Sequence, residues 1–334
     1  MNACTQKRAQ HPIPSGAGIS GFSLIEMMIS ITIGLMIIAA LVGVLTSNSR
    51  SSKTNDRTSE LQGNGRYALD HLTRELRHAG YRGYTPVAPE STSWTTPVIT
   101  NECGTAGSFA KNIRQRVWGG NDSNGDSTDN PFSGNCISGA SAPGTYRQGD
   151  VLVIRRVAGI PTLAASAVAS TIYVRSSYSS MSMLQGSALP AGVTVGTENF
   201  ALQVYTYYIG SDDNDTTVPA LRRVALAGNA MVDEMVVSGI EQMQFEYGLT
   251  NTDGTTQYFT ANNIGTTDHS ATGATNWDKV SSVRIWLLAR NSKPENGYSN
   301  TNTYTMSNQV WGPVNDSFRR QVFSTVVQLR NFRN

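Results

Sequence analysis

Hydrophobic residues are distributed unevenly along the chain, and the longest apolar stretch lies near the N-terminus. Residues 22–45 read FSLIEMMISITIGLMIIAALVGVL, whereas residues 1–21 before them are polar and include Lys7 and Arg8. An α-helix over the apolar stretch spans roughly 36 Å at about 1.5 Å per residue, enough for a hydrocarbon core of about 30 Å. Because the basic flank precedes the apolar stretch, we expect residues 1–21 in the cytoplasm and the remainder across the membrane.

A helical pattern continues after the membrane stretch, through residues 46–80. Apolar residues there recur at steps of three to four, as in an amphipathic helix; they are Leu61, Ala68, Leu72, Leu76 and Ala79, with Leu69 beside them. Gly80 directly follows the last of them, which predicts the end of the helix. Gly63 and Gly65 weaken the middle of the helix and could mark a bend. We therefore predict one long helix, whose first half is membrane-embedded and whose second half lies against a folded domain.

From residue 81 onwards, short β-type runs alternate with Gly, Asn, Asp, Pro and Ser. The predicted strands are Asp150–Val157, Ser170–Ser176, Phe200–Ile209, Leu221–Leu226, Met235–Tyr247, Val280–Ala289 and Phe318–Leu329. Many alternate apolar and polar residues, as half-buried antiparallel strands do. The predicted fold class is α+β, with the long helix packed on one antiparallel β-sheet domain, residues 81–334, that has long loops. Whether residues 85–148 form a separate subdomain stays open.

A single carboxylate, Glu26, interrupts the apolar stretch four residues after Phe22. A lone carboxylate in a membrane costs a few kcal/mol and indicates a function. A cleaved secretory signal would have a shorter apolar region followed by a small-residue site, and a plain uncleaved anchor leaves Glu26 unexplained. A cut after Gly21 would create a free amine on Phe22, which is a natural partner for this carboxylate.

The residues from Gly21 to Glu26, GFSLIE, resemble the type IV prepilin motif. The resemblance implies that a prepilin peptidase cuts after Gly21 and methylates the new terminus on Phe22. It also implies that Glu26 compensates the terminal amine of a neighbouring subunit in the filament. Residues 1–21 would then be a leader that is removed, residues 22–45 the transmembrane half of the helix, and residues 46–80 its periplasmic half.

Five later blocks are similar to the PilW-type minor pilins of type IV pili: residues 65–83, 149–156, 237–248, 283–290 and 320–331. This resemblance implies a pilin-like structural subunit that helps to prime pilus assembly, at or near the tip. Its partners would be other minor pilins, the major pilin, the inner-membrane assembly machinery and a tip adhesin. The precursor would span the inner membrane once, with its C-terminal domain in the periplasm, before joining the filament at the cell surface.

Two alternatives remain open at this point. A pseudopilin of a type II secretion system shares the leader, Glu26 and the helix-plus-sheet plan. A pilus-tip adhesin would place a binding site in the long loops, which include residues 85–148 and 250–277.

The charge pattern and the motifs of the sequence bear on two other functions, nucleic-acid binding and catalysis. The formal net charge is +2, and loss of a leader that carries Lys7 and Arg8 without acidic residues gives 2 − 2 = 0. No cluster of Lys and Arg stands out, so nothing indicates a nucleic-acid partner. The GxSxG, P-loop, HExxH and CxxC motifs are absent, so we predict no enzymatic activity and no cofactor.

Three cysteines are present, and Cys4 belongs to the predicted leader. Cys103 and Cys136 remain, and in an exported domain they predict one disulfide. Closing a loop of about thirty residues contributes roughly 3–4 kcal/mol in the chain-entropy model. The alternative is two independent buried thiols.

The loop between the two cysteines has a pattern of oxygen donors. Asp122, Asn124, Asp126 and Asp129 resemble the start of a calcium-binding EF-hand loop. However, the glycine lies between Asn124 and Asp126, two positions too early, and Ser133 stands where the bidentate glutamate is expected. A calcium site formed by these four residues is therefore a hypothesis beside the simpler interpretation of an acidic surface turn.

Overall fold

The computed structural model of the chain describes residues 21–85, 97–104, 109–133, 135–137, 144–192, 195–251, 253–264 and 275–331. The chain divides into two compact units, Met1–Thr54 and Asn55–Asn334. All the β-structure belongs to the second unit.

One long helix, α1 (Leu24–His78), begins two residues after Phe22 and runs through both units. Its apolar first part is exposed along its length, and in length and composition it is sufficient to cross a membrane. The helix ends where Gly80 adopts a positive φ of 76°, the left-handed conformation that glycine favours at a helix C-terminus. The predicted long helix and its end are confirmed.

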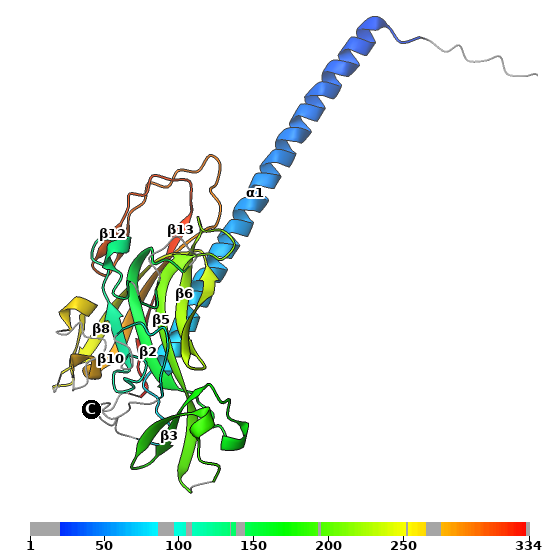
Figure 1. Cartoon of the computed structure of the whole chain (residues 1–334). Helices are drawn as coiled ribbons and strands as arrows, with labels where there is room; N and C mark the ends of the chain where they lie inside the picture. The colour runs from blue at the N-terminus through cyan, green and yellow to red at the C-terminus, as the bar shows by residue number, and fades with distance from the viewer. Residues whose placement is uncertain are drawn as a thin grey trace, which may run out of the picture. The chain divides into compact units, whose positions relative to one another are not determined.

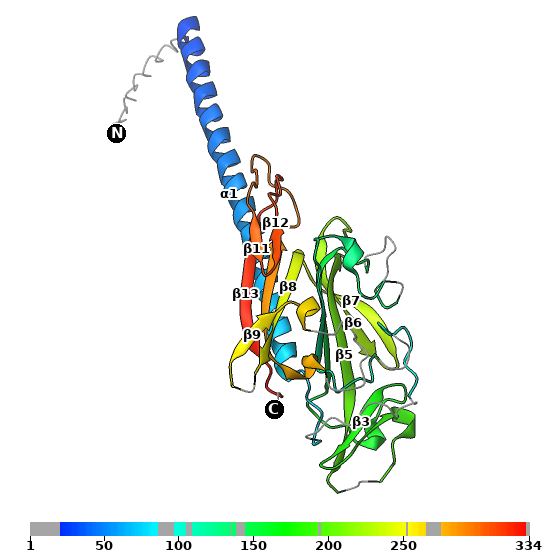
Figure 2. The same cartoon turned by 90° about the vertical axis from the view of Figure 1, so that its left-hand side faces the viewer.

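The second half of α1 packs on the β-structure through one stripe of small and apolar side chains. The buried members within the helix are Leu61, Gly65, Ala68, Leu72 and Leu76. Gly65 is part of the contact, because a Cβ placed on it would lie 2.2 Å from Cε2 of Phe323. Figure 2 shows this part of α1 beside β13 (Arg320–Gln328), the strand that carries Phe323. The helix is continuous through Gly63 and Gly65, so these residues do not interrupt it.

A seven-stranded antiparallel sheet forms one layer of the second unit, and its longest strand, β5, is the centre of the pairing (Figure 1). β5 pairs with β2, β3 and β6, while β1, β4 and β7 extend the sheet outwards. The strands are β1 (Val117–Gly120), β2 (Gln148–Val157), β3 (Ile172–Ser177), β4 (Met181–Gln185), β5 (Thr197–Ser211), β6 (Pro219–Ala227) and β7 (Ala230–Ser238).

A four-stranded antiparallel sheet in the order β13-β10-β8-β9 forms the other layer (Figure 2). Its remaining strands are β8 (Ile240–Thr250), β9 (Thr256–Phe259) and β10 (Val280–Arg290), and a separate hairpin consists of β11 (Tyr304–Met306) and β12 (Gln309–Trp311). Aromatic side chains join the layers: the ring of Tyr247 lies 4.9 Å from that of Trp277, which lies 6.2 Å from that of Trp118. The architecture is the predicted one, a long helix packed on antiparallel β-sheets.

The prediction of one strand over Met235–Tyr247 is wrong. The chain turns at Gly239, whose φ is 80°, so that β7 ends at Ser238 and β8 begins at Ile240 in a different sheet. The Gly239 N–H donates to the Pro219 carbonyl, and its own carbonyl accepts from Arg290. The pattern did not reveal this break because apolar residues continue on both sides of the glycine.

Part of the long loop 85–148 belongs to the main sheet. β1 lies within it and pairs with β2 over four residues, from Val117 opposite Ile154 to Gly120 opposite Val151. The described residues of this loop are therefore joined to the sheet through backbone hydrogen bonds.

Candidate functional site

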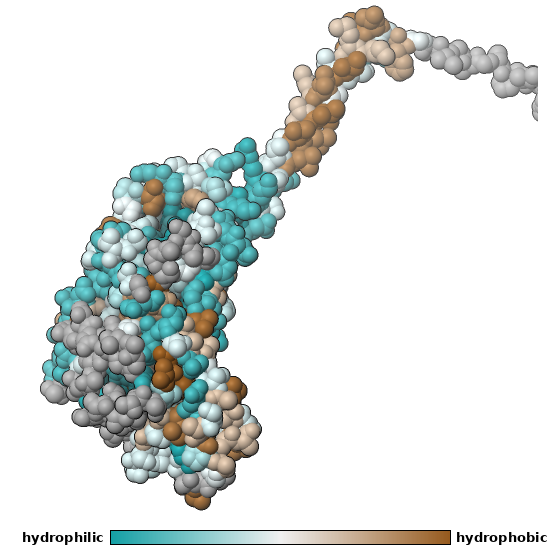
Figure 3. Space-filling model, in the orientation of Figure 1, coloured by the Kyte–Doolittle hydropathy of each residue, from teal (hydrophilic) through white to brown (hydrophobic). Residues whose placement is uncertain are grey.

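The residues of the predicted cleavage and assembly site lie at the start of the apolar helix. Phe22 is 80% exposed, and a Cβ on Gly21 would meet no other atom within 4 Å. Glu26 lies in the first turn of α1 and is exposed. Figure 3 shows the apolar surface that this part of the helix presents. Residues 1–20 of the predicted leader lie outside the described residues, so cleavage after Gly21, methylation of Phe22 and the role of Glu26 stay predictions.

The disulfide predicted from the sequence is present between Cys103 and Cys136, and both residues are buried. The segment that it closes is also attached to β2 through Arg155, which is fully buried. The Arg155 guanidinium donates to the carbonyls of Phe109 and Gln115, at 2.9 and 3.0 Å. Burial lowers the pKa of Arg155 to about 9. This segment is thus fixed by a covalent bond and by charge-assisted hydrogen bonds.

The carboxylates of the predicted calcium site accept hydrogen bonds from nearby N–H and hydroxyl groups. Asp122 is fully buried, and its Oδ1 accepts from the backbone N–H groups of Asn124 and Gly125, while its Oδ2 accepts from that of Gly149 at 2.6 Å. Asp126 accepts from both the N–H and the hydroxyl of Thr128, and these hydrogen bonds lower its pKa.

Asp129 behaves in the same way, because its Oδ2 accepts from the N–H and the hydroxyl of Ser123, at 2.7 and 2.8 Å. Within the part of the chain that the structure describes, no group of three or more His, Cys, Asp or Glu side chains is placed to hold a metal ion. The acidic side chains instead cap turns through their own backbone, as Asp and Asn do in short loops. Calcium binding by these four residues stays a prediction.

A second buried carboxylate, which the sequence did not reveal, anchors this loop. Asp150 on β2 accepts from the N–H of Asp122 at 2.8 Å and from the N–H of Phe245 on β8 at 2.7 Å. Burial raises its pKa well above the usual value for an aspartate. Because Asp150 touches both the loop and β8, it fixes the position of the loop relative to the second sheet.

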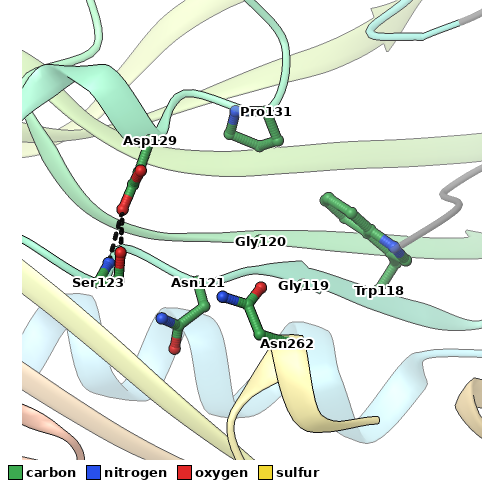
Figure 4. A pocket seen from close by; sticks show the side chains of 8 residues that line it. All are labelled: Trp118, Gly119, Gly120, Asn121, Ser123, Asp129, Pro131 and Asn262. Carbon is green, nitrogen blue, oxygen red and sulfur yellow. Dashed lines mark hydrogen bonds between the residues drawn. The ribbon is translucent and has the colours of Figure 1, made fainter. Parts of the chain in front are cut away.

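Beside this loop lies a pocket of about 400 Å³. One wall is strand β1 with its consecutive glycines, Gly119 and Gly120, and β1 is an edge strand of the seven-stranded sheet. The other walls are the loop residues Asn121, Ser123, Asp129 and Pro131, together with Asn262 from the 3-10 turn Ala261–Asn263 (Figure 4). The sequence could not indicate this pocket, because Asn262 is far from the other residues along the chain.

A buried ionic network connects three strands of the second sheet. Glu241 on β8 forms ion pairs with Arg290 on β10 and Arg320 on β13. Arg320 also pairs with Asp316 at 2.7 Å, and its side chain is only 3% exposed. Buried charges that are paired in this way hold neighbouring strands in a fixed register, whereas removing one partner is strongly destabilising.

No curated protein matches the chain. Residues 206–331 match the family described as Type IV Pilus-assembly protein W. This stretch is similar to the PilW family. It contains the end of β5, strands β6 to β13, and the network of Glu241, Arg290 and Arg320. Three of the blocks that suggested this family in the sequence lie inside it, namely 237–248, 283–290 and 320–331.

One solved structure is also similar to the chain. It is a type IV-like pilin from Thermus thermophilus, with 14% identity and a TM-score of 0.35, and the match covers 84% of this chain and 97% of that one. The pocket beside β1 lies mostly outside the stretch that matches the PilW family, and only Asn262 of its lining belongs to that stretch.

Proposed function

We propose that the chain is the precursor of a minor pilin, a structural subunit of a type IV pilus that helps to start assembly at or near the tip. The observation that carries this proposal is a stretch similar to the PilW family on the same chain as an exposed, apolar helix long enough to cross a membrane. A membrane-embedded subunit with a folded head is what a filament built from packed helices requires, because subunits that meet head to tail without closing into a ring generate helical assemblies.

The chemistry of the helix start supports processing at this place. Glu26 is a carboxylate in an otherwise apolar segment, and its cost in a membrane is offset once a positive group lies beside it. A cut after Gly21 supplies that group as the amine of Phe22. In this proposal the prepilin peptidase acts on the precursor in the inner membrane, with the C-terminal domain in the periplasm. The processed subunit then joins other minor pilins and the major pilin through the inner-membrane assembly machinery.

Mass spectrometry of the N-terminal peptide, taken from protein in sheared pili, tests the processing step directly. We expect a peptide that begins with methylated Phe22, and we expect the Gly21→Ala variant to accumulate at the mass of the unprocessed chain. A native protein that retains residues 1–21 in the pili would contradict the proposal.

Deletion of the gene separates a pilus subunit from a subunit of a secretion system. Loss of surface pili with normal enzyme secretion is the expected result. The opposite result, normal pili with a loss of secreted enzymes, would assign the protein to type II secretion instead.

A further inference from the structure

The pocket beside β1 presents polar groups that the protein does not use itself. The side-chain amides of Asn121 and Asn262 both line it (Figure 4), and neither amide has a hydrogen-bond partner among the described residues. Asn121 is only 9% exposed, and its Oδ1 is buried without a partner. An unpaired buried polar group is costly. A hydrogen bond from this amide to a ligand would remove that cost, and the protein would lose no internal bond.

The neighbouring acidic side chains differ from these amides, because their oxygens already accept hydrogen bonds from the backbone of the loop. Both oxygens of Asp122 and one oxygen of Asp126 accept backbone N–H groups. The hydrogen bonds of these side chains determine the shape of the loop. Asp129 has one oxygen of each kind. Its Oδ2 accepts hydrogen bonds from Ser123, whereas its Oδ1 has no partner among the described residues.

The charge of the lining indicates a neutral ligand. Asp129 is the one ionisable side chain among the lining residues, and no Lys, Arg or His is present to bind an anion. A divalent cation would need several oxygen ligands from the protein, and Asp129 has no acidic neighbour in the pocket with free oxygens. Amides, in contrast, both donate and accept hydrogen bonds, and so do the hydroxyl groups of a polyol.

The size of the pocket is that of a small-molecule site. Its volume is about 400 Å³, within the range of roughly 300–1,000 Å³ that is usual for small-molecule sites. The wall at Gly120 has no side chain, and a Cβ there would lie 2.9 Å from Cγ of Pro131. Larger residues at this position would therefore fill the space between β1 and the loop.

We propose that this pocket binds a neutral carbohydrate through one sugar ring, whose neighbouring hydroxyls pair with the amides of Asn121 and Asn262 and with the free oxygen of Asp129. This inference does not depend on the proposed role in pilus assembly, because the pocket lies within one compact unit and its test requires only purified protein.

The experiment uses the full chain in lipid nanodiscs, which avoid detergents that contain sugars. Methyl glycosides of mannose, galactose, N-acetylglucosamine and fucose are titrated, and binding is measured by saturation-transfer NMR. We expect saturable binding of at least one glycoside. The Asn121→Ala and Asn262→Ala variants should each weaken it about tenfold, the effect of one lost hydrogen bond to a ligand. Neither amide bonds to a described residue, so neither variant should unfold at a lower temperature than the wild-type protein.

Asn263→Ala is the matched control, since Asn263 lies on the same 3-10 turn but does not line the pocket. It should bind the glycoside as the wild-type protein does, and added phosphate or Ca²⁺ should not compete. The proposal is overturned if no glycoside binds saturably, or if binding is unchanged in both lining variants. Displacement of the glycoside by Ca²⁺ in a manner that Asp129→Asn abolishes would overturn it in favour of a metal site.

Discussion

At the residue scale, one of the contacts between α1 and the sheet involves a histidine, His71. Its Nε2 lies 3.0 Å from the hydroxyl of Tyr207 on β5. Burial, followed by the nearby Arg223, lowers the pKa of His71 below its usual value of 6.5. Smaller effects follow: Glu75 raises the pKa, Arg74 lowers it and Asp70 raises it. The folded protein therefore favours neutral His71.

This preference predicts a loss of stability at mildly acidic pH. Below about 6.5 the unfolded chain binds a proton at His71 that the folded chain does not, so the free energy of unfolding falls as the pH falls from about 6.5 towards the lower folded-state pKa. Above 6.5 the contribution is fully present. Urea unfolding followed by circular dichroism at pH 8.0 and pH 5.5 should show a lower midpoint at pH 5.5. The His71→Gln variant should show a smaller difference, and an unchanged difference would refute the assignment.

Single residues are also where the sequence is least informative. Arg155 and Arg156 are adjacent in a strand, so one of them must face inwards, and the pattern does not say which. In the structure Arg155 is fully buried among carbonyl groups, whereas Arg156 pairs with Glu75 of α1. The choice depends on segments 109–116 and 70–78, which reach the strand only in the folded chain.

At the scale of elements, replacing two glycines of α1 by alanine should change the stability of the protein in opposite directions. Gly63 has no neighbour within 4 Å of an added Cβ, whereas Gly65 meets the ring of Phe323 at 2.2 Å. Gly63→Ala should therefore stabilise the protein by about 0.5–1 kcal/mol, since alanine is the better helix former. Gly65→Ala should destabilise it by about 1–3 kcal/mol through overpacking against β13.

Chemical unfolding of the two variants, beside the wild-type chain, measures this difference. Each variant adds the same methyl group to the same helix, so helix propensity cancels in the comparison. Equal free energies of unfolding for Gly63→Ala and Gly65→Ala would show that Phe323 does not pack on the helix at this point.

The elements that the sequence predicted well are those with strong local patterns. The apolar stretch, the stripe from Leu61 to Ala79 and the strands that alternate over many residues are all present. The short strands β1, β4, β9, β11 and β12 were not predicted, because three to five residues carry too little periodicity. The pocket could not be predicted, since its walls come together only when the two sheets pack. The acidic loop was recognised as unusual, but its carboxylates serve its own backbone.

At the scale of the whole molecule, Glu26 should matter for assembly and not for folding. It lies in the unit Met1–Thr54, apart from the unit that holds the β-structure. Glu26→Ala should therefore leave membrane insertion, leader cleavage and the stability of the β-sheet domain unchanged. The amount of this subunit in sheared pili should fall about tenfold or more, because the amine of Phe22 then lacks its partner in a low-dielectric environment.

Immunoblots of sheared pili and of membranes, with equal loading of total protein, provide the measurement. Ser30→Ala is a suitable control, because its hydroxyl bonds only to the Glu26 carbonyl one turn away. Wild-type amounts of the Glu26→Ala protein in pili would show that the amine and the carboxylate do not pair.

The disulfide between Cys103 and Cys136 determines when part of the domain gains its full stability. Such a bond forms where an oxidant reaches the chain and not in the reducing cytosol. The bond encloses β1 and the loop 121–131 across a sequence separation of 33 residues. Until it closes, the walls of the pocket lack a constraint of roughly 3–4 kcal/mol. In the proposed route to the pilus, the walls of the pocket therefore gain this constraint only after the chain reaches an oxidising compartment.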